Sequence, residues 1–214
     1  MNVFVSVGTG LSVPQEAFVS AVEARLRAIG LHPCTIGRNT FSSDAPLRAV
    51  TELMNRCAGA VVIALERYRF PAGIERPGSD KERPLSGASL STPWNQIEAA
   101  MAYSRGLPLL VLVDRDVRSD GLLEKGNDWY VQEISLDGAV LNSTEFGGIL
   151  ADWRDRVTKR ASSPAKPSAG KPDPAEMPVG QLLALLKPRQ LWALLVAAAG
   201  ALGGAFALGA GLFG

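Results

Sequence analysis

Apolar residues along positions 1–160 follow two patterns that alternate along the chain. Short runs such as AVVIAL predict strands, and because they are apolar throughout, they are typical of strands buried on both faces of a parallel sheet. Longer stretches with apolar residues every three or four positions predict helices that pack one face on that sheet. Strands are predicted at 3–7, 31–36, 60–65, 109–113 and within 130–136, and helices at 14–29, 46–57, 93–104 and 144–158.

This order of strands and helices predicts an α/β fold with a doubly wound, mostly parallel sheet in domain 1–160. In such sheets, ligands bind beyond the carboxyl ends of the strands, near the point where the strand order reverses. The second helix is expected to be capped by Ser43 or Asp44 and to turn Leu47 inward. The connection 66–92 is long and rich in Gly, Ser, Pro, Lys and Arg, which predicts either a functional lid or a disordered loop.

Polar residues that directly follow the predicted strands are the candidates for ligand binding. A guanidinium group suits a phosphate, and a tyrosine ring can stack on a base. An arginine-rich strand end can equally be a solvated surface, so both interpretations stay open. No G-x-G-x-x-G follows the first strand and no G-K-[ST] is present, which argues against dehydrogenase and phosphate-loop chemistry. The candidates are Gly8, Thr9, Arg38, Asn39, Arg67, Tyr68 and Arg69.

The helix at 93–104 carries the most suggestive pair of side chains. Trp94 and Glu98 are four residues apart and therefore share one helical face, which Met101 continues. A carboxylate among apolar neighbours must find polar partners or serve a function. Glu98 is therefore the candidate catalytic residue and Trp94 a candidate ligand contact. The alternative is a structural glutamate bonded to a nearby loop.

At these residues the chain resembles a known family. VFVSV as the first strand, RCAGAVVIALERY before the long connection, and W-x-x-x-E leading into LPLLVLV resemble a bacterial TIR domain. The same pattern is similar to nucleoside deoxyribosyltransferase-like domains. The resemblance covers roughly residues 3–113 and implies a TIR or flavodoxin-like layout.

The resemblance also implies a role for Glu98 at the ribose of NAD or of a nucleoside, where the bond to the base breaks. A carboxylate there stabilises or attacks an oxocarbenium-like centre. The turn after the first strand reads Val7-Gly8-Thr9-Gly10, whereas TIR enzymes commonly have a serine-rich turn at this place. Nucleotide binding without cleavage is therefore the alternative, with NAD or a cyclic (di)nucleotide as the ligand and no permanently bound cofactor.

Charge and composition narrow the function classes. Lys and Arg total 22 and Asp and Glu total 21, for a net charge of +1, which argues against a nucleic-acid binder. The two cysteines, Cys34 and Cys57, exclude a disulfide scaffold and a zinc site built mainly on thiolates. With His32 as the single histidine, no metal site is predicted.

The C-terminal part has a different character. Residues 191–214 contain no charge, and as a helix they would extend about 36 Å, enough to cross a bilayer core of about 30 Å. Gly200 and Gly204 form a G-x-x-x-G pair that favours close packing of two membrane helices. Basic residues precede this run and none follows it. The expected topology is thus a single C-terminal pass in a bacterial inner membrane with the first domain cytoplasmic. The proline-rich segment 161–190 is the predicted linker and juxtamembrane region.

Two functions from different classes are consistent with this sequence, beside a plain membrane-tethered scaffold. The leading hypothesis is a membrane-anchored effector of antiphage defence. Its first domain would bind a nucleotide-derived signal, and self-association through this domain, Gly200 and Gly204 would disrupt the lipid bilayer. The alternative is an NAD glycohydrolase or nucleoside N-glycosidase that uses Glu98, with the tail as a simple anchor.

Overall fold

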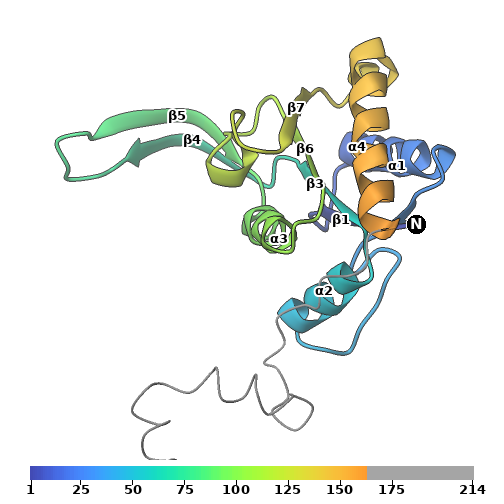
Figure 1. The fold of residues 1–214 in the computed structure, drawn as a ribbon. Coiled ribbons are helices and arrows are strands. Elements are labelled where there is room, and N and C mark those ends of the chain that lie inside the picture. The colour runs from blue at the N-terminus through green and yellow to red at the C-terminus, as the bar shows by residue number, and fades with distance from the viewer. Residues whose placement is uncertain (163–214) are drawn as a thin grey trace, which may run out of the picture. The chain divides into compact units, whose positions relative to one another are not determined.

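The computed structural model describes residues 1–162, which form a parallel five-stranded sheet with helices on both faces (Figure 1). The strand order is β2-β1-β3-β6-β7, and every neighbouring pair is parallel. The prediction of an α/β fold with a mostly parallel sheet is therefore confirmed. The strands of the sheet are β1 (Asn2–Val7), β2 (His32–Cys34), β3 (Gly59–Ala64), β6 (Leu109–Asp114) and β7 (Tyr130–Ile134).

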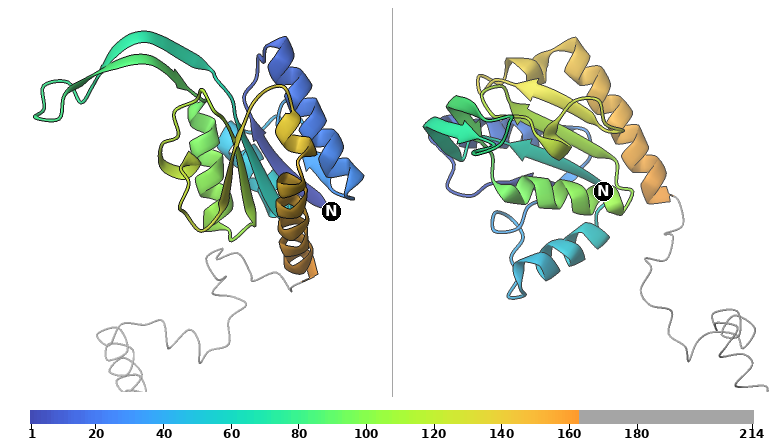
Figure 2. Two further views of the ribbon diagram at one scale, coloured as in Figure 1. Left: turned by 90° about the horizontal axis from the view of Figure 1, so that it is seen from above. Right: turned by 90° about the vertical axis from the view of Figure 1, so that its left-hand side faces the viewer.

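The helices divide between the two faces of the sheet (Figure 2). Trp153 and Val157 of α4 are fully buried in one apolar core, which the apolar side of α1 shares. Helices α2 and α3 pack in a second core on the other face, which includes Phe4 of β1 and Ala99 of α3. The helices are α1 (Val13–Ala28), α2 (Pro46–Asn55), α3 (Pro93–Ser104) and α4 (Thr144–Ser162), with short 3₁₀ turns η1 (Gly121–Leu123) and η2 (Ala139–Asn142).

The strand order reverses between β1 and β3. The chain moves outward from β1 to β2, then returns across β1 to place β3, β6 and β7 on the other side. With the two hairpin strands set aside, this is the flavodoxin-like order, in which the crevice between the first and third strands binds ligands. The topology therefore selects one place in the fold for a site.

The connection 66–92 is not a disordered loop, so that alternative is wrong, while its role as a functional lid stays a prediction. It forms an antiparallel arm of β4 (Tyr68–Glu75) and β5 (Arg83–Leu90), which extends away from the sheet (Figure 1). The arm is tied to the rest of the chain at its base, where Ser89 pairs with Val117. Toward the tip of the arm, the Arg118 guanidinium donates to the carboxylate of Glu75, the last residue of β4, at 2.9 Å.

Two local predictions on the second helix are also wrong. The residue at its N-cap position is Ala45, whose side chain has no atom that could cap the helix. The Asp44 carboxylate instead accepts a hydrogen bond from the Ser42 hydroxyl at 3.2 Å. Leu47 is 54% exposed rather than turned inward. The second strand is also shorter than predicted, because the amides of Arg38, Asn39 and Thr40 turn back onto the Thr35 carbonyl.

None of the helices in residues 1–162 combines the length and the apolar character that crossing a bilayer requires. The predicted span 191–214 and most of the predicted linker 161–190 lie outside the described residues. The predicted division of the chain at residue 160 stays a prediction, and α4 continues to Ser162.

Candidate functional site

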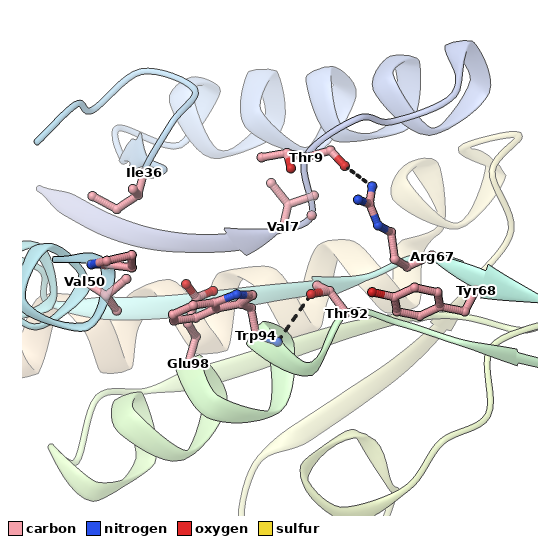
Figure 3. A pocket seen from close by; sticks show the side chains of 11 residues that line it. Val7, Thr9, Ile36, Val50, Arg67, Tyr68, Thr92, Trp94 and Glu98 are labelled. Carbon is pink, nitrogen blue, oxygen red and sulfur yellow. Dashed lines mark hydrogen bonds between the residues drawn. The ribbon is translucent and has the colours of Figure 1, made fainter.

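A cavity of about 420 Å³ lies at the carboxyl ends of β1 and β3, where the strand order reverses. Its walls come from the end of β1, the turn after β2, the start of α2, the start of β4 and the first two turns of α3 (Figure 3). The residues that line it are Val7, Gly8, Thr9, Ile36, Pro46, Val50, Arg67, Tyr68, Thr92, Trp94 and Glu98.

Helix α3 positions the two residues that the sequence singled out. Thr92 precedes the helix and its hydroxyl accepts a hydrogen bond from the Trp94 amide at 3.4 Å, while Pro93 occupies the first helical position. Pro at this position and Thr before it are typical of a helix start. The four-residue spacing then brings the Trp94 indole and the Glu98 carboxyl side by side into the cavity (Figure 3).

The environment of Glu98 is unusual for a carboxyl group. The residue is only 9% exposed, and burial raises its pKa from the ordinary 4.5 to about 7. A hydrogen bond from the Ser6 hydroxyl acts in the opposite direction and lowers the pKa. Desolvation therefore dominates, since burial penalises the charged form. A carboxyl group with a pKa near neutrality changes protonation state in the working pH range and is suited to acid–base or nucleophilic chemistry.

The part of the cavity wall that follows β3 presents a cation and an aromatic ring. The Arg67 guanidinium donates to the Thr9 carbonyl at 2.5 Å, which holds it at the edge of the cavity (Figure 3). Tyr68 lines the same wall and is 48% exposed. A ligand in the cavity thus meets a guanidinium, a phenol, an indole and a carboxyl group.

Six of the nine residues proposed from the sequence line this one cavity, and three do not. The Arg38 guanidinium is held on α1, where it donates to Glu23 at 2.8 Å and to Glu16 at 2.9 Å. Asn39 folds back on its own turn: its side chain accepts from the Thr35 amide and donates to the Pro33 carbonyl. Arg69 donates to Glu66 at 2.8 Å. The residues brought together are Gly8, Thr9, Arg67, Tyr68, Trp94 and Glu98.

Sequence reasoning missed two buried polar residues beneath the cavity, Ser6 and Asn95. Each is 1% exposed, and the Asn95 amide donates to the Ser6 hydroxyl oxygen at 3.0 Å. A signal for Ser6 was present, since it is the single polar residue in VFVSV. Within residues 1–162, no group of three or more His, Cys, Asp or Glu side chains is placed to hold a metal ion.

Fold and cavity together define an α/β protein with a ligand-sized cavity at the switch point of a flavodoxin-like sheet. No protein-family model and no curated protein matches the chain. Among solved structures, it is similar to a CMP N-glycosidase of Clostridium botulinum, BcmB, at 13% identity and a TM-score of 0.34, over 53% of this chain and 72% of that one.

The chain is also similar to the TIR domains of the activated Roq1 resistosome that directly recognises the pathogen effector XopQ. The identity is 14% and the TM-score 0.36, over 86% of this chain and 97% of that one. At these values neither likeness bears on activity or on the site, whose interpretation depends on the geometry of the cavity itself.

Proposed function

We propose that the chain binds a nucleotide in this cavity and cleaves the bond between its ribose and its base. The observation that carries the proposal is the Glu98 carboxyl, buried in a cavity of ligand size with its pKa raised to about 7. Trp94 and Tyr68 provide aromatic surfaces for a base, and Arg67 provides a guanidinium for a phosphate.

In the proposed reaction, the bond between C1′ and the base nitrogen breaks and its electron pair leaves with the base. The ionised Glu98 carboxylate stabilises the oxocarbenium-like C1′ or adds to it, and water then supplies the hydroxyl group of the ribose product. The proton of that water passes to Glu98 or to solvent. Because the reaction needs the carboxylate form, the rate is expected to rise with pH through the pKa of Glu98.

The composition of the cavity favours one class of substrate. A neutral base needs a proton as it leaves, whereas a pyridinium base such as nicotinamide is already cationic and leaves neutral. Among the described residues that line the cavity, Glu98 is the single carboxyl group, and it cannot be both the proton donor and the carboxylate in one step. NAD is therefore the substrate that we expect, in agreement with the role that the sequence resemblance implies.

The test is release of the free base by the full-length protein, measured by chromatography with NAD and, separately, with a neutral-base nucleoside monophosphate. NAD should be cleaved, and Glu98→Gln should reduce turnover on the order of a thousandfold, because the amide can neither ionise nor form a stable ester. Glu52→Gln, which changes an exposed glutamate of α2, is the matched control and should leave turnover unchanged. Undiminished turnover in Glu98→Gln, or no cleavage by the unaltered protein, would refute the proposal.

A second candidate function is the membrane-anchored effector, favoured by the uncharged run at 191–214. In this proposal, the cavity senses a nucleotide and the tails associate through Gly200 and Gly204 in the bilayer. Replacing both glycines with Ile should abolish depolarisation of expressing cells while leaving NAD cleavage intact. Depolarisation that persists in this double variant would contradict helix association as its cause.

A further inference from the structure

Three buried polar residues lie next to one another beneath the cavity, and only Glu98 has a role in the proposed reaction. Side chains alternate along β1, so Ser6 shares the side of Phe4, which packs in the core with Ala99 of α3. Ser6 therefore points toward α3, where it meets Asn95. Both residues are 1% exposed, and within the described residues the buried Asn95 amide oxygen has no hydrogen-bond partner.

The Asn95 amide has a defined orientation. Its nitrogen donates to the Ser6 hydroxyl oxygen at 3.0 Å and to the Ile63 carbonyl oxygen at 3.4 Å. A carbonyl can only accept a hydrogen bond, so the amide must turn its NH₂ group to this side. The Ser6 oxygen then accepts from Asn95, and the hydroxyl proton is left to be donated elsewhere.

The one carboxyl group on α3 is that of Glu98. It lies one turn after Asn95 on α3, and the Ser6 hydrogen bond favours its ionised form against the effect of burial. The charged residues on the elements packed against α3 are Arg48 and Glu52 of α2 and Asp114 of β6, and Arg67 lies across the cavity. Burial and Ser6, rather than any of these charges, are the causes that set the pKa of Glu98.

We infer that Ser6 and Asn95 are positioning residues for Glu98. The Asn95 amide orients the Ser6 hydroxyl so that the hydroxyl proton points at the Glu98 carboxylate. The chain of donors runs in one direction, from amide to hydroxyl to carboxylate. This chain of hydrogen bonds holds the carboxylate from the side of β1 and increases the fraction of Glu98 that is ionised at neutral pH. The kinetic consequence of this inference depends on the proposed function, but the hydrogen-bond chain itself does not.

The experiment is a ¹³C NMR titration of the full-length protein labelled at its glutamate carboxyl carbons, with the Glu98 signal assigned by its loss in Glu98→Gln. In Ser6→Ala the midpoint of the Glu98 titration should move upward by about one pH unit, the size expected for loss of one hydrogen bond to a charged group. Ser6→Cys keeps a weak donor of similar size and should produce a smaller upward move.

Ser89→Ala is the matched control. Ser89 is also buried, and its hydroxyl donates to Glu66 at 2.5 Å, where it is the first cause of a lowered pKa. In this variant the Glu66 titration should move upward and the Glu98 titration should stay unchanged. This pattern separates loss of a specific donor from a general loosening of the fold.

An unchanged Glu98 titration in Ser6→Ala would overturn the inference, whether or not the protein cleaves NAD. If the titration moves and NAD is not cleaved, the positioning role stands and the proposed function fails. If NAD is cleaved, the acidic limb of the kcat/KM profile should move upward in Ser6→Ala together with the NMR titration. A profile that stays in place would contradict the positioning role even though the enzyme is active.

Discussion

The burial of the Glu98 carboxyl group makes the stability of the fold depend on pH. An ionised carboxylate loses stabilising hydration when it is buried. Desolvation in the cavity wall therefore raises the pKa of Glu98 from 4.5 to about 7. The neutral form is thus favoured in the folded chain at pH values where the unfolded chain holds the ionised form. Glu98 should therefore lower the stability of the protein as the pH rises.

The Glu98→Gln variant should show this effect directly. The stabilising contribution of the protonated carboxyl is fully present below pH 4.5 and is lost as the pH rises through 7. Glutamine has no such loss, so the variant should gain stability over the unaltered protein between pH 4 and pH 8, by on the order of 3 kcal/mol. Urea unfolding at the two pH values measures the difference, with Glu52→Gln as control. An equal gap between variant and unaltered protein at both pH values would contradict a raised pKa.

The arginines show what sequence reasoning cannot decide at the residue scale. Arg38 and Arg67 both follow predicted strands and were equal candidates for phosphate binding. The turn after β2 delivers Arg38 to Glu16 and Glu23 of α1, whereas Arg67 reaches Thr9 and lines the cavity. These partners are 15 to 58 residues away in the sequence, so the tertiary packing decides which of them each arginine reaches. The place of Glu98 beside Trp94 in the cavity wall was predictable, because the two residues are four apart on one helix and share its face.

At the scale of elements, the site depends on how closely the sheet and the helices pack. Gly59 begins β3, the strand that ends at the cavity, and it lies directly under α4. A Cβ atom at Gly59 would come within 2.5 Å of Val157 and 3.2 Å of Trp153, both of which are fully buried. The absence of a side chain at this position thus lets α4 rest on the sheet.

Gly59→Ala should therefore destabilise the protein by about 1–3 kcal/mol, because overpacking a full core forces side chains out of their preferred rotamers. Gly148→Ala is the matched control on α4: nothing lies within 4 Å of its added Cβ, and alanine is the better helix former, so stability should rise by up to about 1 kcal/mol. Chemical denaturation measures both. A neutral Gly59→Ala would mean that α4 does not pack as described.

The long connection 66–92 is the element that sequence reasoning misjudged. Its Gly, Pro and charged residues suggested a loop, but Tyr68, Phe70, Ala72 and Ile74 alternate with other residues, and this is the two-residue period of a strand. Pro71 and Pro84 argued against strands at the level of sequence. Both lie in a two-stranded arm, where each strand is an edge strand and proline is tolerated. The central strands were easier to predict because strands buried on both faces are continuously apolar.

At the scale of the whole molecule, the described residues form an α/β unit, and several of its helices and strands contribute residues to the cavity. The remaining sequence adds an uncharged run of membrane-spanning length at 191–214. We expect this run to anchor the chain in a bilayer.

The anchor is tested by washing membranes of expressing cells with alkaline carbonate. Full-length protein should remain in the membrane pellet, because about 20 or more apolar residues hold a helix in the bilayer against such extraction. A variant with Lys in place of Leu202 and Ala205 carries two charges in the middle of the run and should be released. Release of the unaltered protein into the supernatant would contradict the anchor.

The central claim is that the cavity at the end of β1 and β3 binds a nucleotide with its ribose at Glu98. A crystal structure of the full-length Glu98→Gln variant with NAD tests this most directly, because the variant should bind without cleaving. We predict the C1′ atom of the nicotinamide ribose in contact with the residue 98 side chain, an aromatic contact to Trp94 or Tyr68, and a phosphate on Arg67. NAD bound elsewhere, or absent from the cavity at saturating concentration, would contradict the account.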